Sequence, residues 1–123
     1  DGHGAHLLSV YLHTDPLIMT PDEVEAQLEG LAAAIVANLD AASRCSVEAE
    51  LDAVRDYLSS MIAPPSGLAI FSCTPRRFFR IVRLPVDVIP AAYWARWAHV
   101  VPLLEAGGHA EELAHELPSP PSL

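Results

Sequence analysis

The chain has 123 residues, 51% of them hydrophobic, which is the size and apolar content of one domain with one core. Sixteen acidic residues outnumber seven basic ones, and the formal charge of −9 disfavours wrapping of bare nucleic acid. The two cysteines, Cys45 and Cys73, form no C-x-x-C pattern, which excludes a disulfide framework and a thiolate zinc site. Without a membrane-length apolar run or a signal-peptide pattern, we expect a soluble cytoplasmic protein.

The first predicted strand covers residues 7–12, where a short apolar, β-favouring run stops before Pro16. A helix is predicted from Pro21, with Thr20 as its N-cap and Glu23 completing a capping box. The apolar residues of this helix recur at 3.6-residue spacing, which predicts a helix with one face on a sheet. They are Val24, Leu28, Leu31, Ile35 and Leu39.

A second helix is predicted after a break at residues 41–45, with Ser46 as its cap. Its buried face is also expected at helical spacing and consists of Val47, Leu51, Val54, Leu58 and Met61. The two helices therefore form an α-hairpin with a short tip. Ser43 and Arg44 are the candidate contact residues at this tip.

The turn at residues 63–67 contains two prolines, which rule out helix, and Gly67, which allows a positive φ. The run that follows, residues 68–73, is the best candidate for a central strand because of its length, composition and flanking turns. Residues 78–84 predict another strand, paired with the first as a hairpin across residues 74–77.

Beyond this hairpin, prolines confine residues 86–89 to a sheet edge or a linking segment. Two further short helices are predicted at residues 100–104 and 109–117. Residues 1–117 then form a single α/β domain, and residues 118–123 form a Pro/Ser-rich tail or linker. The expected fold is a small mixed β-sheet with the α-hairpin and the further short helices packed on it.

No catalytic constellation is present in the sequence. There is no nucleophile turn and no glycine-rich phosphate loop, and Cys73 at a strand end is interpreted as a small apolar core residue. His109 and His115 lie six residues apart, on different faces of a helix, and form no H-E-x-x-H pattern. We therefore predict no catalytic residue, no metal site and no cofactor.

Four of the seven arginines fall within eight positions and are interleaved with two phenylalanines: Arg76, Arg77, Arg80 and Arg83. On a strand, Arg77 and Arg83 share one face, and the other two arginines share the opposite face. One interpretation is contact with RNA, because guanidinium groups fit phosphates and phenylalanine stacks on bases. The other is a solvated strand face whose arginines balance nearby carboxylates.

The aromatic residues Tyr93, Trp94 and Trp97 also allow two interpretations. Large aromatic side chains are enriched in the cores of protein interfaces, which makes these three residues candidates for protein contact. They are equally suited to closing the hydrophobic core beneath the last helix.

Three segments carry a resemblance to a known family: Ser9-Val10-Tyr11-Leu12, the helix 54–61 running through Pro64-Pro65-Ser66-Gly67 into Leu68-Ala69-Ile70-Phe71, and Val100-Val101-Pro102-Leu103-Leu104. In this order they resemble the N-terminal domain of the archaeal and eukaryotic class-I peptide-chain release factors. The resemblance extends to the bacterial relatives of that family, including the hibernation-factor type.

The resemblance implies a sandwich of helices on a small sheet and the ability to bind ribosomes. The codon-reading members carry Asn-Ile-Lys-Ser at the hairpin tip, whereas this chain has Ala41-Ala42-Ser43-Arg44-Cys45, so stop-codon recognition is not implied. Gly107-Gly108 is followed by His109, not by the glutamine of the family's Gly-Gly-Gln loop.

The function expected from the sequence is that of a non-catalytic, ribosome-associated binding module in translation or hibernation, with no membrane or DNA partner. The alternative is a stand-alone protein-interaction or self-associating domain with no ribosomal role. That alternative would use the aromatic residues rather than the arginines as its contact surface.

Overall fold

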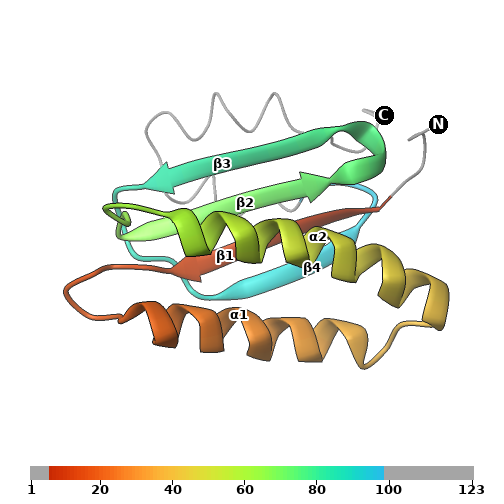
Figure 1. Ribbon diagram of the computed structural model, residues 1–123, viewed down its shortest axis with the longest axis horizontal. Coiled ribbons are helices and arrows are strands. Elements are labelled where there is room, and N and C mark those ends of the chain that lie inside the picture. The colour runs from red at the N-terminus through yellow and green to blue at the C-terminus, as the bar shows by residue number, and fades with distance from the viewer. Residues whose placement is uncertain (1–5, 99–123) are drawn as a thin grey trace, which may run out of the picture.

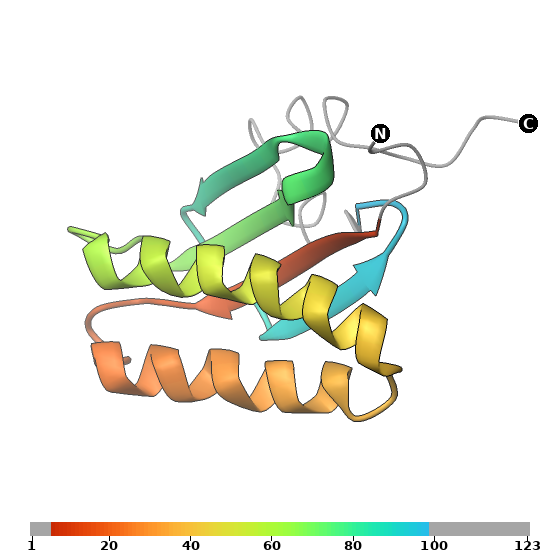
Figure 2. The same ribbon diagram turned by 45° about the vertical axis from the view of Figure 1, so that its right-hand side comes forward.

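Two helices lie side by side on one face of a four-stranded sheet in the computed structural model, which describes residues 6–98 (Figures 1 and 2). The elements in chain order are β1 (Leu7–His13), α1 (Pro21–Val36), α2 (Ala41–Ser60), β2 (Gly67–Cys73), the 3₁₀ turn η1 (Thr74–Arg76), β3 (Phe78–Leu84) and β4 (Ala91–Ala95). The strand order is β3-β2-β1-β4. The predicted α/β class and the α-hairpin are confirmed.

All neighbouring strands in this sheet are antiparallel, so the prediction of a mixed sheet is wrong. The reason lies in the helical hairpin. Helix α1 carries the chain away from the end of β1 and α2 carries it back, so β2 begins beside the end of β1, where His13 pairs with Gly67. A strand that starts there runs antiparallel to β1.

The two central strands, β1 and β2, are buried on both faces of the sheet. Every residue of β2 is buried, and so is every residue of β1 except His13. Alternate residues point to opposite faces, so each strand contributes to a core cluster on either side. This double burial explains why both strands are nearly continuous apolar runs, and it confirms residues 68–73 as a central strand.

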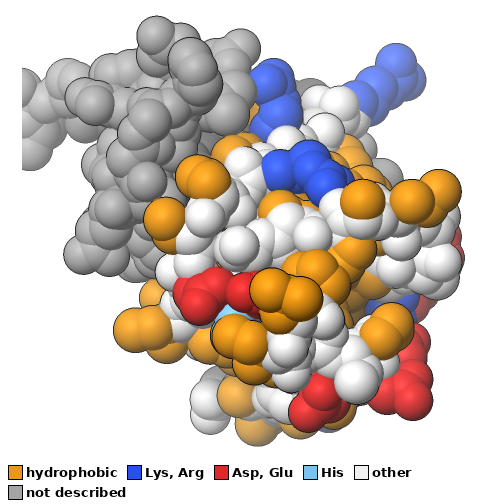
Figure 3. Space-filling view, turned by 90° about the vertical axis from the view of Figure 1, so that its left-hand side faces the viewer, with side chains coloured by type: hydrophobic (Ala, Val, Ile, Leu, Met, Phe, Trp, Pro, Cys, Tyr) orange, Lys and Arg blue, Asp and Glu red, His pale blue; other side chains and the backbone are white. Residues whose placement is uncertain are grey.

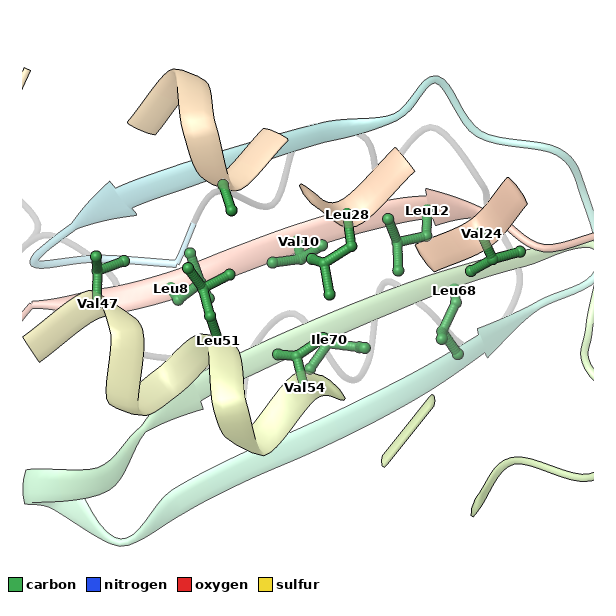
Figure 4. Packing of buried hydrophobic residues seen from close by; sticks show 11 residues of the cluster. Leu8, Val10, Leu12, Val24, Leu28, Val47, Leu51, Val54, Leu68 and Ile70 are labelled. Carbon is green, nitrogen blue, oxygen red and sulfur yellow. The ribbon is translucent and has the colours of Figure 1, made fainter. Parts of the chain in front are cut away.

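The helix-facing core fills the space between the hairpin and the two central strands (Figure 4). The helices contribute Val24, Leu28, Val47, Leu51 and Val54, and the strands contribute Leu8, Val10, Leu12, Leu68 and Ile70. Full burial of one such side chain stabilises the fold by roughly 1.5–3 kcal/mol. The helical spacing of apolar residues in the sequence therefore identified the packed faces of both helices.

Helix α1 begins as the sequence predicts. The Thr20 Oγ1 accepts the Glu23 N–H at 3.2 Å, and the Glu23 carboxylate accepts the Thr20 N–H at 2.9 Å. The hydrogen bond from the Thr20 backbone N–H to the Glu23 carboxylate, with a smaller contribution from the Thr20 side chain, holds the pKa of Glu23 below its ordinary value. The helix ends at Val36, and Leu39 packs on the core from beyond its end.

Helix α2 begins five residues before the predicted cap at Ser46. Asp40 is the N-cap, and its side chain accepts the Ser43 N–H at 2.8 Å. Ser46 lies inside the helix, where its hydroxyl donates to the Ala42 carbonyl. Residues 41–45 form the first turn of the helix rather than a break because an aspartate cap precedes two alanines, the best helix formers.

The turn between α2 and β2 uses Ala63, not Gly67, for its left-handed backbone, with φ of 53°. The Arg83 guanidinium donates to the Ala63 carbonyl and so ties this turn to β3. Gly67 is required for a different reason: a Cβ there would lie 2.4 Å from the Val86 carbonyl oxygen. The glycine lets the segment between β3 and β4 cross directly over the start of β2.

The sequence pattern alone predicted no helix or strand for the three aromatic residues between positions 93 and 97. In the structure, Tyr93 and Trp94 belong to β4, and Trp97 follows it. Residues 85–90 are the link between β3 and β4, in agreement with the expectation from their prolines. The predicted helices at residues 100–104 and 109–117, His109, His115 and the tail lie outside the described residues.

We expect the substitution Gly67→Ala to lower the free energy of unfolding by about 1–3 kcal/mol, because the new methyl group forces the Val86 carbonyl away. Gly30→Ala is the matched control. A Cβ on Gly30 meets no atom within 4 Å, and alanine in a helix should raise stability by roughly 0.5–1 kcal/mol. Urea unfolding followed by circular dichroism measures both; equal effects of the two substitutions would contradict the close approach.

Candidate functional site

The antiparallel topology brings four of the seven arginines to one end of the molecule. The end of β2, the start of β3, the end of β4 and the start of α2 all lie there, at the right of Figure 1. We call this the arginine end and define it by Arg44, Arg76, Arg77 and Arg96. Arg96 directly follows β4, so its place could be assigned only once that strand was known.

A pocket of about 520 Å³ opens at the arginine end, between the first half of α2, the η1 turn and β4. Its polar lining includes Ser43, Ser46 and Thr74. Trp94 closes one side and stacks on His6, with ring centroids 5.5 Å apart. The pocket therefore joins the predicted hairpin tip to one of the predicted contact aromatics.

Glu50 forms the floor of this pocket and is only 2% exposed. Its carboxylate accepts hydrogen bonds from the Ser72 hydroxyl at 2.7 Å and from the Thr74 hydroxyl and N–H, both at 2.9 Å. These bonds fix the η1 turn, and with it the two arginines that follow Thr74, against α2. The sequence analysis missed Glu50; its position one turn from Val47 and Val54, on the apolar face of α2, was the available signal.

The hairpin-tip candidates lie in the first turn of α2. Ser43 is half-buried and lines the pocket, and its hydrogen bonds, chiefly from the backbone N–H, lower the pKa of Asp40. Arg44 is exposed, and its Nε donates to the Val36 carbonyl at 3.1 Å. Arg44 therefore also helps to hold the ends of the two helices together.

The four clustered arginines do not form one surface. Arg76 belongs to the η1 turn and Arg77 is an exposed residue with a left-handed backbone, so neither follows the predicted strand alternation. On β3, Arg80 lies on the sheet face opposite the helices, whereas Arg83 lies on the helix side at the far end of the strand. The predicted pairing of faces is wrong because the strand starts only at Phe78.

The three aromatic candidates are also divided. Tyr93 packs on the core cluster of the sheet face opposite the helices, and Trp94 packs on the helix-facing cluster. Trp97 follows β4, and the Arg96 guanidinium lies 5.8 Å from its ring centroid. Alternation along β4 separates Tyr93 from Trp94, so they cannot contribute to one flat contact surface.

Arg55 takes part in a separate group of charges that joins the two helices. On the outer face of the hairpin, Arg55 forms ion pairs with Glu29 and Asp52, both at 2.8 Å, and with Glu48 at 3.4 Å. The hydrogen bonds from Arg55 lower the pKa of Glu29. Arg55 thus joins the two helices, which is a structural role rather than a ligand-binding one.

Of the cysteines, Cys73 is fully buried, in agreement with its interpretation as a core residue, and Cys45 is exposed.

Neither α1 nor α2 combines the length and apolar character that a bilayer-crossing helix needs, and residues 6–98 contain no other α-helix.

The opposite end of the molecule holds a group that the sequence analysis did not connect. His13, Asp15 and Asp87 each offer a potential metal-ligand atom, and these atoms lie within 4.8 Å of one another. Figure 3 views this end, where a small histidine surface lies beside acidic side chains and exposed hydrophobic side chains. The prediction of no metal site weighed only the histidines near the C-terminus, whereas this group forms only in the folded chain.

Comparisons with known proteins leave the chain without an assigned family. A scan against protein-family models gives no match, and a search of curated proteins gives none either. The release-factor resemblance therefore depends on the motifs quoted above.

We expect Glu50→Gln to lower the free energy of unfolding by about 1.5–3 kcal/mol, because it replaces a charged, buried hydrogen-bond acceptor. Glu48→Gln is the matched control, because Glu48 lies on the same helix and its side chain is exposed. Loss of its ion pair should lower the free energy of unfolding by less than about 1 kcal/mol. Urea unfolding compares the two variants. Similar costs would show that Glu50 does not fix the turn.

Proposed function

We propose that the chain is a non-catalytic binding module in translation or ribosome hibernation, which acts in the cytoplasm and contacts ribosomal RNA with its arginine end. The observation that carries the proposal is the gathering of four arginines at the end of the molecule where a pocket opens, in a chain with a formal charge of −9. The resemblance to release-factor N-terminal domains supports the same function, because the α-hairpin tip lies at this end.

The chemistry of the arginine end suits an RNA backbone. Guanidinium groups bind phosphate oxygens through paired hydrogen bonds, and the exposed Arg77 is presented on a turn that Glu50 anchors. Hydroxyl groups of Ser43 and Thr74 line the pocket beside Trp94, and aromatic rings provide stacking surfaces for unpaired bases.

The charge distribution favours binding in one orientation. With a formal charge of −9, the chain as a whole is repelled by phosphate, so only the arginine end can approach RNA closely. Affinity for bare RNA should therefore be low. We expect recognition to depend on a shaped ribosomal surface that also accommodates the hairpin.

The rival function, self-association or protein binding through the aromatic residues, has less support. Tyr93 and Trp94 face opposite sides of the sheet, and both are half-buried. A contact through them would involve only one of the two at a time.

The proposal is tested by sedimentation with bacterial ribosomes at low and moderate salt. We expect the chain to co-sediment at low salt and to dissociate as salt rises, because phosphate contacts depend on counterion release. The double variant Arg76→Gln with Arg77→Gln should bind more weakly. The slope of the logarithm of the affinity against the logarithm of the salt concentration should also become shallower by about 1 to 2, because each arginine removed takes away up to one phosphate contact.

The matched control is Leu17→Glu with Ile62→Glu, which changes the net charge by the same amount at the opposite end. These side chains are 92% and 85% exposed, so the fold should tolerate both changes. We expect the control to bind ribosomes like the unaltered chain. Absence of co-sedimentation at either salt, or equal loss in both double variants, would refute the proposal.

A further inference from the structure

The group at the opposite end consists of side chains from three separate segments. His13 is the last residue of β1, Asp15 follows two residues later, and Asp87 belongs to the link between β3 and β4. The His13 Nε2 lies 3.4 Å from the Asp87 Oδ1. The histidine side chain is 21% exposed and that of Asp87 is 54% exposed, so the group sits at the surface with one partly covered member.

The polar atoms of this group are not satisfied by one another. The His13 Nε2 is buried and has no hydrogen-bond partner, although the Asp87 carboxylate lies near it. Potential ligand atoms of the two aspartates and the histidine lie within 4.8 Å of one another. A buried imidazole nitrogen without a hydrogen-bond partner beside two carboxyl groups is an environment that a divalent cation would satisfy.

The backbone around His13 is held rigidly by α1. The Gln27 side chain accepts the His13 N–H at 2.7 Å and donates to the His13 carbonyl at 3.0 Å. The next residue, Thr14, donates through its hydroxyl to the Pro65 carbonyl at 2.7 Å and through its N–H to the Ser66 carbonyl at 3.1 Å. These bonds fix the strand end from two sides.

The two aspartates are positioned by other local contacts. The Asp15 Oδ1 accepts the Leu17 N–H at 2.9 Å, which orients that carboxylate. Asp87 is brought to His13 by the crossing of the Val86 carbonyl over Gly67, the residue that pairs with His13 in the sheet. Pre-positioned ligands lose less conformational entropy on binding, which favours a real site over a chance cluster.

We propose that His13, Asp15 and Asp87 bind a divalent first-row transition metal ion such as Zn²⁺. One imidazole nitrogen and two carboxylate oxygens match the ligand types that zinc accepts, and three protein ligands leave a position for water. Mg²⁺ and Ca²⁺ prefer sites made only of oxygen ligands, so they should bind less well. The site is separate from the arginine end, and its existence does not depend on ribosome binding.

The proposal is tested by calorimetric titration of the chelator-treated chain with zinc chloride at neutral pH, with magnesium chloride as the comparison. We expect one zinc ion to bind and magnesium to bind much more weakly. Asp87→Asn and His13→Gln should each weaken zinc binding by at least about tenfold. Asp87→Asn keeps the test valid if His13→Gln fails to fold, because Asp87 is exposed.

Two controls remove other potential ligands among the described residues. His6→Gln removes the histidine that these residues place at the arginine end, and Asp22→Asn removes an exposed carboxylate from the first turn of α1. Both variants should bind zinc like the unaltered chain. No zinc binding by the unaltered chain, or unchanged affinity in Asp87→Asn, would overturn the proposal and leave the group as an ordinary histidine–aspartate pair.

Discussion

The antiparallel pairing of β1 and β2 is the constraint on which the rest of the structure depends. Both strands are buried on both faces, and alternate residues of each belong to different core clusters. A shift of one strand by one residue would turn each of its side chains to the opposite face of the sheet, into the wrong cluster. The observed register sets His13 beside Gly67 at one end and Leu8 beside Ser72 at the other. Every functional candidate in the described residues lies at or near one of these two ends.

Each end of this strand pair is secured by a contact that apolar patterning does not specify. At the arginine end, the buried Glu50 carboxylate joins α2 to the turn after β2. At the other end, Gly67 admits the Val86 carbonyl and so sets the path of the link toward β4. The core supplies most of the stability, and these two contacts determine where the arginines and the His13 group are presented.

Most of the fold follows from local sequence signals. The capping box at Thr20, the helical spacing of apolar residues and the strand after the Pro-Pro turn were all identified correctly, because each depends on neighbouring residues. The start of α2 was misplaced because Asp40 was not considered as a cap. The candidate sites were harder: Arg96 and Asp87 join their groups only through the strand order, a tertiary property that periodicity does not contain.

The central claim is that the arginine end faces ribosomal RNA, and site-specific photocrosslinking tests it most directly. A photoreactive amino acid in place of Ala42, an exposed residue that lines the pocket, should crosslink to ribosomal RNA, and the same group in place of Leu17 should not. Crosslinks from Leu17 alone, or from neither position under conditions of co-sedimentation, would contradict the account.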